Sequence, residues 1–433
     1  MTFKDFFNPG NTIRAAAKTK KLTATILILL SLAIPCFLIL SCKKKAASSE
    51  PQSSNGTQVP IIPVKHPPVC NFIVSLGTES TMPLTLYCID LSDGDSLTYT
   101  WKMDGKTVAV SASPTLAVNK EGIYNIRLTI GNKFGKDSME KAIRVLPYQQ
   151  TYKDFDGITL SLYAWEGKKI TILSRKNNLN RQTMLKWLKA LDDTYNYYYQ
   201  CTGQEPTPGS STYLNNRLTI ADVPTTCGAG CGYLGATGIE LQNLYFDKSY
   251  NAIDQNDEFD QTAFYEFGRN FWFLSDNLAY KSTDPVTTGY AVFMRFMAME
   301  VIHVNGAPFN SWTFPVFRTN VENLIDTYLA NPSLNWSNTL GIGQGISGSG
   351  LGATDLFASF CFRLRKNYGD DAFVKKLWKE AAIRPKATTT QDAVDNFFLA
   401  ACAAANKNLT SVFNSWHWPL STNATTEASK YPI

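Results

Sequence analysis

The pattern of apolar and polar residues changes once along the chain, near residue 147. Before that point, apolar and polar residues alternate in short runs: NFIVSL, LTLYCID, LTYTWKM, YNIRLTI and KAIRVL. Turn-forming clusters at 92–95 and 104–105 separate some of these runs. Strands with a period of two, spaced about ten to fifteen residues apart, are typical of an antiparallel β-sandwich. We therefore predict an all-β sandwich of about 80 residues over 66–147.

From residue 148 onward the pattern predicts strands first and helices afterwards. The strand-like pieces are GITLSLYAW, KKITILSR, RLTIADV and GIELQNLYF. Apolar residues at steps of three and four predict helices over 181–200, 258–276, 286–304, 315–330, 353–367, 370–381 and 391–404. A β-rich front half followed by a helical back half indicates an α+β domain over 148–433.

The N-terminal region has the pattern of an export or anchoring signal. Residues 22–41 are uncharged and almost entirely apolar, and they follow the basic stretch 18–21. A small residue before Cys42 resembles the lipobox of bacterial lipoproteins, which implies a signal peptide over 1–41 and a lipid on Cys42. A single uncleaved membrane helix is the alternative. Residues 42–65, rich in Lys, Ser and Pro, predict a flexible tether, and either reading places the rest outside the cytoplasm, at the outer membrane or cell surface.

Composition and charge exclude several classes of protein. Of 433 residues, 44 % are hydrophobic and 18 % are charged, which is typical of folded rather than disordered chains. The formal net charge is +5. Residues 1–41 hold five Lys or Arg and one Asp, or +4, so the remainder carries about +1 and no basic surface for nucleic acid is expected. Three histidines limit the number of metal sites or catalytic triads.

The cysteines suggest an oxidising compartment. The candidates for disulfides are Cys70, Cys88, Cys201, Cys227 and Cys231. Cys70 and Cys88 lie on neighbouring predicted strands, which allows a disulfide between them. The stretch from Cys227 to Cys231 lacks the second Cys or His pair that a zinc knuckle needs, and a disulfide involving Cys201, Cys227 and Cys231 is favoured over zinc.

Three motifs in the first domain resemble the PKD (polycystic kidney disease) domain. They are the Asp93-Gly94-Asp95 turn, the Tyr99-Thr100-Trp101 strand and the Gly-x-Tyr strand over 122–130. The resemblance implies an Ig-like sandwich that acts as a spacer or as a weak binder of protein or polysaccharide. Trp101 is interpreted as a core anchor, because a small sandwich needs one large apolar group between its sheets.

The helix over 261–272 resembles the metal-binding helix of zinc metallopeptidases. In that motif two His at i and i+4 bind zinc, and the Glu between them activates water. The resemblance places the first ligand at Tyr265, the base at Glu266 and the second ligand at Arg269. Arginine stays protonated and cannot bind zinc. In the gluzincin group the third ligand is a Glu on the next helix, and here that position is Thr288.

Segments between 358 and 421 also resemble the enhancin-like, mucin-degrading branch of this superfamily. The resemblance implies a zincin-like fold that has lost all three metal ligands, so no cofactor is expected. The carboxylate of Glu266 and the guanidinium of Arg269 are three residues apart and can form an ion pair. The alternative is an ordinary amphipathic helix whose Phe264, Phe267 and Phe271 face a core.

The function that follows is a cell-surface lipoprotein whose second domain binds protein, glycoprotein or polysaccharide without catalysis. Candidate aromatic residues for sugar stacking are Tyr197, Tyr198, Tyr199 and Trp312. The alternative is an active metallopeptidase or glycopeptide hydrolase that uses Glu266 as base with an atypical metal site, for which Glu300 and His303 are the remaining ligand candidates. The glycine-rich run 341–352 lacks a following Lys-Ser/Thr and predicts a loop rather than a phosphate site.

Overall fold

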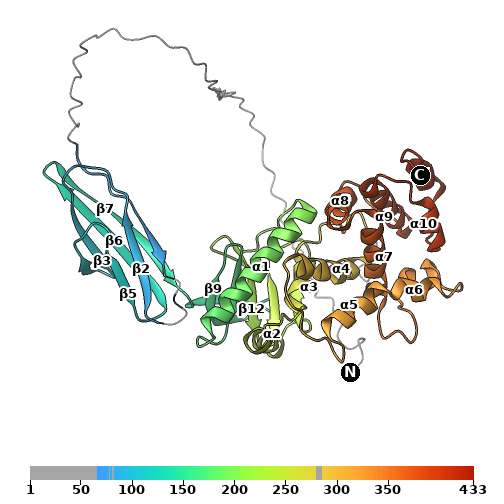
Figure 1. The fold of residues 1–433 in the computed structure, drawn as a ribbon, viewed down its shortest axis with the longest axis horizontal. Coiled ribbons are helices and arrows are strands. Elements are labelled where there is room, and N and C mark those ends of the chain that lie inside the picture. The colour runs from blue at the N-terminus through green and yellow to red at the C-terminus, as the bar shows by residue number, and fades with distance from the viewer. Residues whose placement is uncertain (1–65, 78, 80–81, 279–284) are drawn as a thin grey trace, which may run out of the picture.

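The computed structural model describes residues 66–77, 79, 82–278 and 285–433, which form a β-sandwich followed by an α+β domain (Figure 1). The predicted signal peptide 1–41, the lipidation site Cys42 and the tether 42–65 lie outside the described residues. Among the described helices, none is both long enough and apolar enough to cross a membrane.

Two antiparallel sheets form the sandwich. One sheet has the order β1-β2-β5 and the other the order β4-β3-β6-β7. The strands are β1 (Phe72–Leu76), β2 (Leu84–Asp90), β3 (Thr98–Met103), β4 (Lys106–Ala109), β5 (Thr115–Val118), β6 (Gly122–Asn132) and β7 (Gly135–Val145). The alternating pattern therefore formed strands as predicted, because alternate side chains of each strand face the partner sheet.

Trp101 fills the centre of this sandwich. Its side chain is fully buried and meets Phe72 edge to face, with ring centroids 5.0 Å apart. The indole N–H donates to the carbonyl of Ser111 at 2.9 Å, so burial leaves no polar atom of the ring unpaired. This residue is a core anchor, as the sequence indicates.

A mixed seven-stranded sheet begins the second domain; six of its strands follow the order β13-β14-β12-β10-β9-β8, and β11 pairs with β12 beside them. Its strands are β8 (Tyr148–Lys153), β9 (Thr159–Glu166), β10 (Ile170–Ser174), β12 (Arg217–Val223), β13 (Gly230–Gly232) and β14 (Ile239–Gln242), with the short β11 (Tyr213–Leu214) beside β12. Strands β10, β12 and β14 run parallel, whereas β13 lies antiparallel to β14 at one edge. Because β13 is the last strand in this order, one of its edges has no partner strand.

The helix α1 (Arg181–Thr202) connects β10 to β12 and packs against the sheet. It starts at Asn180, whose side chain accepts from two backbone N–H groups of the first turn, and it ends at Gly203 in the left-handed conformation. The remaining helices are α2 (Asn243–Asn256), α3 (Thr262–Asn270), α4 (Pro285–Val301), α5 (Phe314–Glu322), α6 (Leu324–Leu329), α7 (Ala353–Tyr368), α8 (Asp370–Ala382), α9 (Thr390–Ala405), α10 (Thr410–Ser415) and α11 (Thr422–Ala428).

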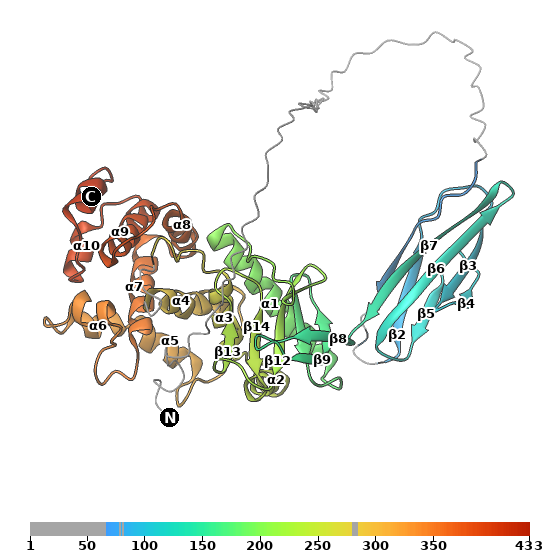
Figure 2. The same ribbon diagram turned by 180° about the vertical axis from the view of Figure 1, so that it is seen from behind.

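Figures 1 and 2 show the helical half and the sandwich on opposite sides of the mixed sheet. The predicted fold class, a sandwich followed by an α+β domain with a helical C-terminal half, is confirmed. Three predicted elements differ in extent. The piece 238–246 is a strand only to Gln242 and then becomes α2, the helix over 258–276 is shorter, and the helix over 315–330 divides at Asn323.

A polar cluster joins the two domains around Glu166 at the end of β9. Its carboxylate, only 8 % exposed, accepts from the hydroxyl of Tyr148 and the amide of Asn215, each at 2.7 Å. The guanidinium groups of Arg144, on β7 of the sandwich, and Arg217, on β12, lie 3.9 and 3.8 Å from it. Because one buried anion holds groups from both domains, the sandwich is tied to the second domain rather than merely linked to it.

We expect Glu166→Gln to destabilise the chain by about 1–3 kcal/mol, because it leaves two arginines facing each other without the anion between them. Calorimetry should also resolve separate unfolding of the two domains. Glu140→Gln, on an exposed position of β7, is the matched control and should change stability by less than about 0.5 kcal/mol. An unaltered, single transition in Glu166→Gln would contradict the proposed coupling.

Candidate functional site

The candidate site is built on α3. Asp260 begins this helix by accepting from the backbone N–H and hydroxyl of Thr262, at 2.9 and 2.6 Å. The apolar face buries Phe264 and Phe267 completely, which fixes the rotation of the helix. This rotation sets the directions in which the side chains of Tyr265, Glu266 and Arg269 leave the helix.

Glu266 is buried, with 5 % of its surface exposed. Burial raises the pKa of its carboxyl to about 7, and the Arg269 guanidinium and a hydrogen bond from the backbone N–H of Gly232 only partly oppose that rise. The ion pair expected between Glu266 and Arg269 is not among the ion pairs of the described residues, and Arg269 acts on Glu266 only as a nearby charge. A carboxyl of this kind changes protonation near neutral pH.

Tyr265 and Thr288 meet across α3 and α4. Their hydroxyl groups share a hydrogen bond, although Thr288 lies 23 positions later in the chain. Burial raises the pKa of the Tyr265 phenol, while Arg269 acts in the opposite direction. The structure thus joins Tyr265 to Thr288 by a hydrogen bond and places the charges of Glu266 and Arg269 near the Tyr265 phenol.

Sequence reasoning missed a second buried charge pair beside this cluster. Arg295 on α4 is 5 % exposed, and its guanidinium lies 5.2 Å from the ring centre of Phe317 and 5.7 Å from that of Tyr265. Asp355, fully buried near the start of α7, faces it as the main opposing charge. Burial lowers the pKa of Arg295 and raises that of Asp355, and each opposes the shift in the other.

One signal in the sequence could have identified Arg295. It is the only charged residue in the stretch 286–299, which is otherwise mostly apolar. A lone charge in such a stretch needs a buried partner. Nothing comparable marks Asp355, whose carboxylate also accepts from the N–H of Gly352 and so resembles an ordinary N-terminal helix residue.

The edge strand β13 covers Glu266 and Arg269. A Cβ atom at Gly232 would lie 2.9 Å from the Glu266 carbonyl oxygen and 3.2 Å from the Arg269 Cβ. A Cβ atom at Gly230 would lie 3.1 Å from the Glu266 Cγ. Only glycine allows such a close approach at Gly232. The strand is therefore in direct contact with the helix face that carries the candidate site.

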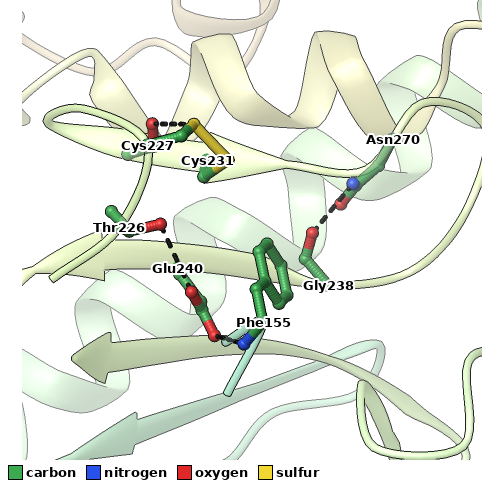
Figure 3. Close-up of a disulfide and its surroundings, with 8 residues drawn as sticks. Phe155, Thr226, Cys227, Cys231, Gly238, Glu240 and Asn270 are labelled. Carbon is green, nitrogen blue, oxygen red and sulfur yellow. Dashed lines mark hydrogen bonds between the residues drawn. A yellow bond between two sulfur atoms is a disulfide. The ribbon is translucent and has the colours of Figure 1, made fainter. Parts of the chain in front are cut away.

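A disulfide between Cys227 and Cys231 closes the loop that leads into β13 (Figure 3). Thr226, just before it, donates to Glu240 on β14 at 3.2 Å, and the backbone N–H of Phe155 donates to the same carboxylate at 2.7 Å. Burial raises the pKa of the Glu240 carboxyl to about 7. Two buried glutamates therefore contact the segment around the disulfide: Glu240 at Thr226 and Glu266 at Gly232.

The cluster does not fit a zinc ion. Tyrosine, arginine and threonine occupy the ligand positions, and arginine adds a positive charge where a metal would lie. Within the described part of the chain, no three His, Cys, Asp or Glu side chains are grouped to hold a metal ion.

The other ligand candidates have different partners. Glu300 pairs with Arg318 and Arg365. His303 lines a cavity of about 220 Å³ beside Lys186 and Lys189, and that cavity does not include Glu266. His417 contacts the carbonyl of Leu334 through its Nδ1. The atypical metal set around Glu266, Glu300 and His303 is therefore not assembled here.

Two predictions about individual side chains were wrong. Cys70, Cys88 and Cys201 are buried free thiols. Cys88 lies opposite Val74 across β1 and β2, so it does not face Cys70. Tyr197 and Tyr198 are buried in the core of α1, where each hydroxyl has a hydrogen-bond acceptor. Tyr199 remains exposed, and Trp312 is half-buried.

Comparison with known proteins matches residues 72–145 to the family model of the PKD domain. No curated protein matches the sequence. A functionally unknown conserved protein from Bacillus anthracis str. Ames is similar to this chain, with 10 % identity, coverage of 85 % of this chain and 72 % of the other, and a TM-score of 0.45.

Two metallopeptidases are also similar to this chain. One, solved in complex with Tn antigen, has 12 % identity, coverage of 85 % and 72 %, and a TM-score of 0.41. The other, ZmpB from Clostridium perfringens, has 12 % identity, coverage of 85 % and 73 %, and a TM-score of 0.40.

We expect stability to fall as pH rises from about 4.5 to about 7, because Glu266 keeps its proton in the folded chain but loses it near 4.5 when unfolded. The raised pKa corresponds to a contribution of up to about 3 kcal/mol, present below pH 4.5 and lost above pH 7. Urea denaturation between pH 4 and 8 measures it. Glu266→Gln should flatten this profile, and Glu240→Gln should do so to a similar extent; a profile unchanged in both variants would contradict the assignment.

Proposed function

We propose that this protein is an extracytoplasmic, lipid-anchored protein whose second domain is a zinc-peptidase relative without catalytic activity that binds protein or glycan. The observation that carries this proposal is the cluster of Tyr265, Arg269 and Thr288 around Glu266. These residues occupy all three ligand positions of the resemblance; Thr288 hydrogen-bonds to Tyr265, and the Arg269 charge acts on both Tyr265 and Glu266. The PKD domain serves as a spacer or adhesion module.

The position of Glu266 supports the loss of chemistry. A general base must reach a water molecule that attacks the substrate. Here the carboxylate accepts from Gly232, lies opposite the Arg269 guanidinium and is covered by β13. Its hydrogen-bonding capacity is therefore directed to the protein itself.

An aromatic stack gives the domain a surface for ligand binding next to this cluster. The half-buried ring of Trp312 lies nearly parallel to Phe317, at 17° and 5.9 Å, and Phe317 in turn contacts the Arg295 guanidinium. Arg295 contacts the ring of Tyr265. We place the ligand over Trp312, because a partly exposed indole with a fixed orientation suits the apolar face of a sugar ring or a peptide side chain.

The alternative function is a hydrolase that uses Glu266 as its base. The raised pKa of Glu266, about 7, is the single observation that favours it, since a base that titrates near neutral pH is efficient. This alternative needs a metal or another activator of water. The residues around Glu266 do not supply one.

We expect the full-length chain, purified without chelator, to contain no stoichiometric zinc by elemental analysis. The triple variant Tyr265→His, Arg269→His, Thr288→Glu should bind about one zinc per chain, because these changes restore three competent ligands and remove a competing cation. Adding Glu266→Gln to the triple variant should leave the zinc content unchanged, since that residue is not a ligand. Stoichiometric zinc in the parent would instead support the hydrolase.

We expect Trp312→Ala to weaken binding of a mucin-type O-glycopeptide about tenfold, which corresponds to the loss of one aromatic contact of about 1.4 kcal/mol. Isothermal titration calorimetry with glycosylated and unglycosylated forms of one peptide separates glycan from peptide recognition. Tyr87→Ala removes an exposed ring from β2 of the sandwich and is the matched control. Equal affinity of both variants and the parent would contradict a ligand site at Trp312.

A further inference from the structure

Residues 226–238 form a hairpin that contains the disulfide, and its strand β13 packs against Glu266. The Ala229 carbonyl accepts from the Gln242 N–H, and the Tyr233 N–H donates to the Gly238 carbonyl. Backbone groups of an antiparallel strand face its partner at every second residue, so residues 229, 231 and 233 face β14. The polar groups of Gly230 and Gly232 therefore point to the unpaired edge. The Gly232 N–H there donates to the Glu266 carboxylate.

The same strand presents its two faces to different environments. Gly230 and Gly232 face α3, with Glu266 and Arg269 in close contact. Cys231 points to the opposite face because successive side chains of a strand alternate. Its partner Cys227 is exposed, and Cys231 is partly exposed. The disulfide is thus accessible to a reductant, whereas the site beneath the strand is not accessible to a ligand.

We propose that the Cys227–Cys231 disulfide is a redox-controlled strap: while oxidised it holds β13 over Glu266 and Arg269, and its reduction uncovers them. The three-residue strand has few other attachments at its start, namely the contact of Thr226 with Glu240 and the bond of Gln242 to Ala229. Without the disulfide, these attachments and the three-residue ladder to β14 hold the start of the strand, and a strand of this length is too short to be stable alone. This inference does not depend on which ligand the domain binds.

The reductant is a dithiol, such as the paired thiols of an extracytoplasmic reductase. One of its thiolates attacks the exposed Cys227 sulfur, which forms a mixed disulfide and releases Cys231 as a thiolate that takes up a proton. The second thiol of the reductant then displaces Cys227, which also takes up a proton. The balance is two thiols on this chain and one disulfide on the reductant.

Hydrogen–deuterium exchange tests the proposal on the full-length chain, with and without tris(2-carboxyethyl)phosphine. Among the described cysteines, the other five are already free thiols, so the phosphine has one target there. Closing a five-residue loop contributes an amount equivalent to about 30-fold in an opening equilibrium. We expect amides 229–233 to exchange about 30-fold faster after reduction, while amides of β9 and β10 keep their rates.

Carboxyl labelling provides the second readout. Carbodiimide coupling of an amine, followed by mass spectrometry, should modify Glu266 in the reduced chain and leave it unmodified in the oxidised one. Asp355, which is fully buried on α7, should stay unmodified in both and is the internal control. The double variant Cys227→Ser, Cys231→Ser should behave like the reduced parent without any reductant.

Three results would overturn the proposal. One is equal exchange of amides 229–233 in both redox states. Another is a rise in exchange spread evenly over the sheet, which would make the disulfide a general support of the fold. The last is an unmodified Glu266 after reduction, because the strand would then remain closed. Since zinc content and glycopeptide affinity play no part in these readouts, failure here leaves the proposed function to its own tests.

Discussion

Charge compensation inside the protein is the constraint on which the centre of the second domain depends. Glu266 and Asp355 are buried acids, and Arg269 and Arg295 are the cations that face them. Buried charges are tolerated only when paired or hydrogen-bonded. Helix α4 packs against both α3 and α7, and this arrangement brings the groups together.

The hydrogen bonding of the buried pair Arg295 and Asp355 is incomplete. Within the described residues, two guanidinium nitrogens of Arg295 and one carboxylate oxygen of Asp355 lack hydrogen-bond partners. The rings around Arg295 stabilise its charge without accepting conventional hydrogen bonds. This centre is therefore held by long-range attraction and by packing.

The sequence predicted the fold where a single periodicity dominates. Period-two runs predicted the sandwich, and α7, α8 and α9 lie within two residues of their predicted bounds. It failed where tertiary contacts decide. The helix over 258–276 ends at Asn270, because that side chain donates to the carbonyls of Tyr233 and Gly238 and the chain turns toward the hairpin. The strand β13 has no apolar alternation at all, since its glycines are required by contact with α3.

The site was predicted by resemblance, and its surroundings were not. The motif names Tyr265, Glu266, Arg269 and Thr288 together, but no local pattern indicates that a strand ending 34 residues before Glu266 covers it. The two facts have one physical explanation. A buried carboxyl needs partners inside the protein, and Gly232, Arg269 and the covering strand supply a donor, a cation and exclusion of water. Each of these partners also limits access to the carboxyl, so the contacts that stabilise the buried glutamate are the same ones that cover it.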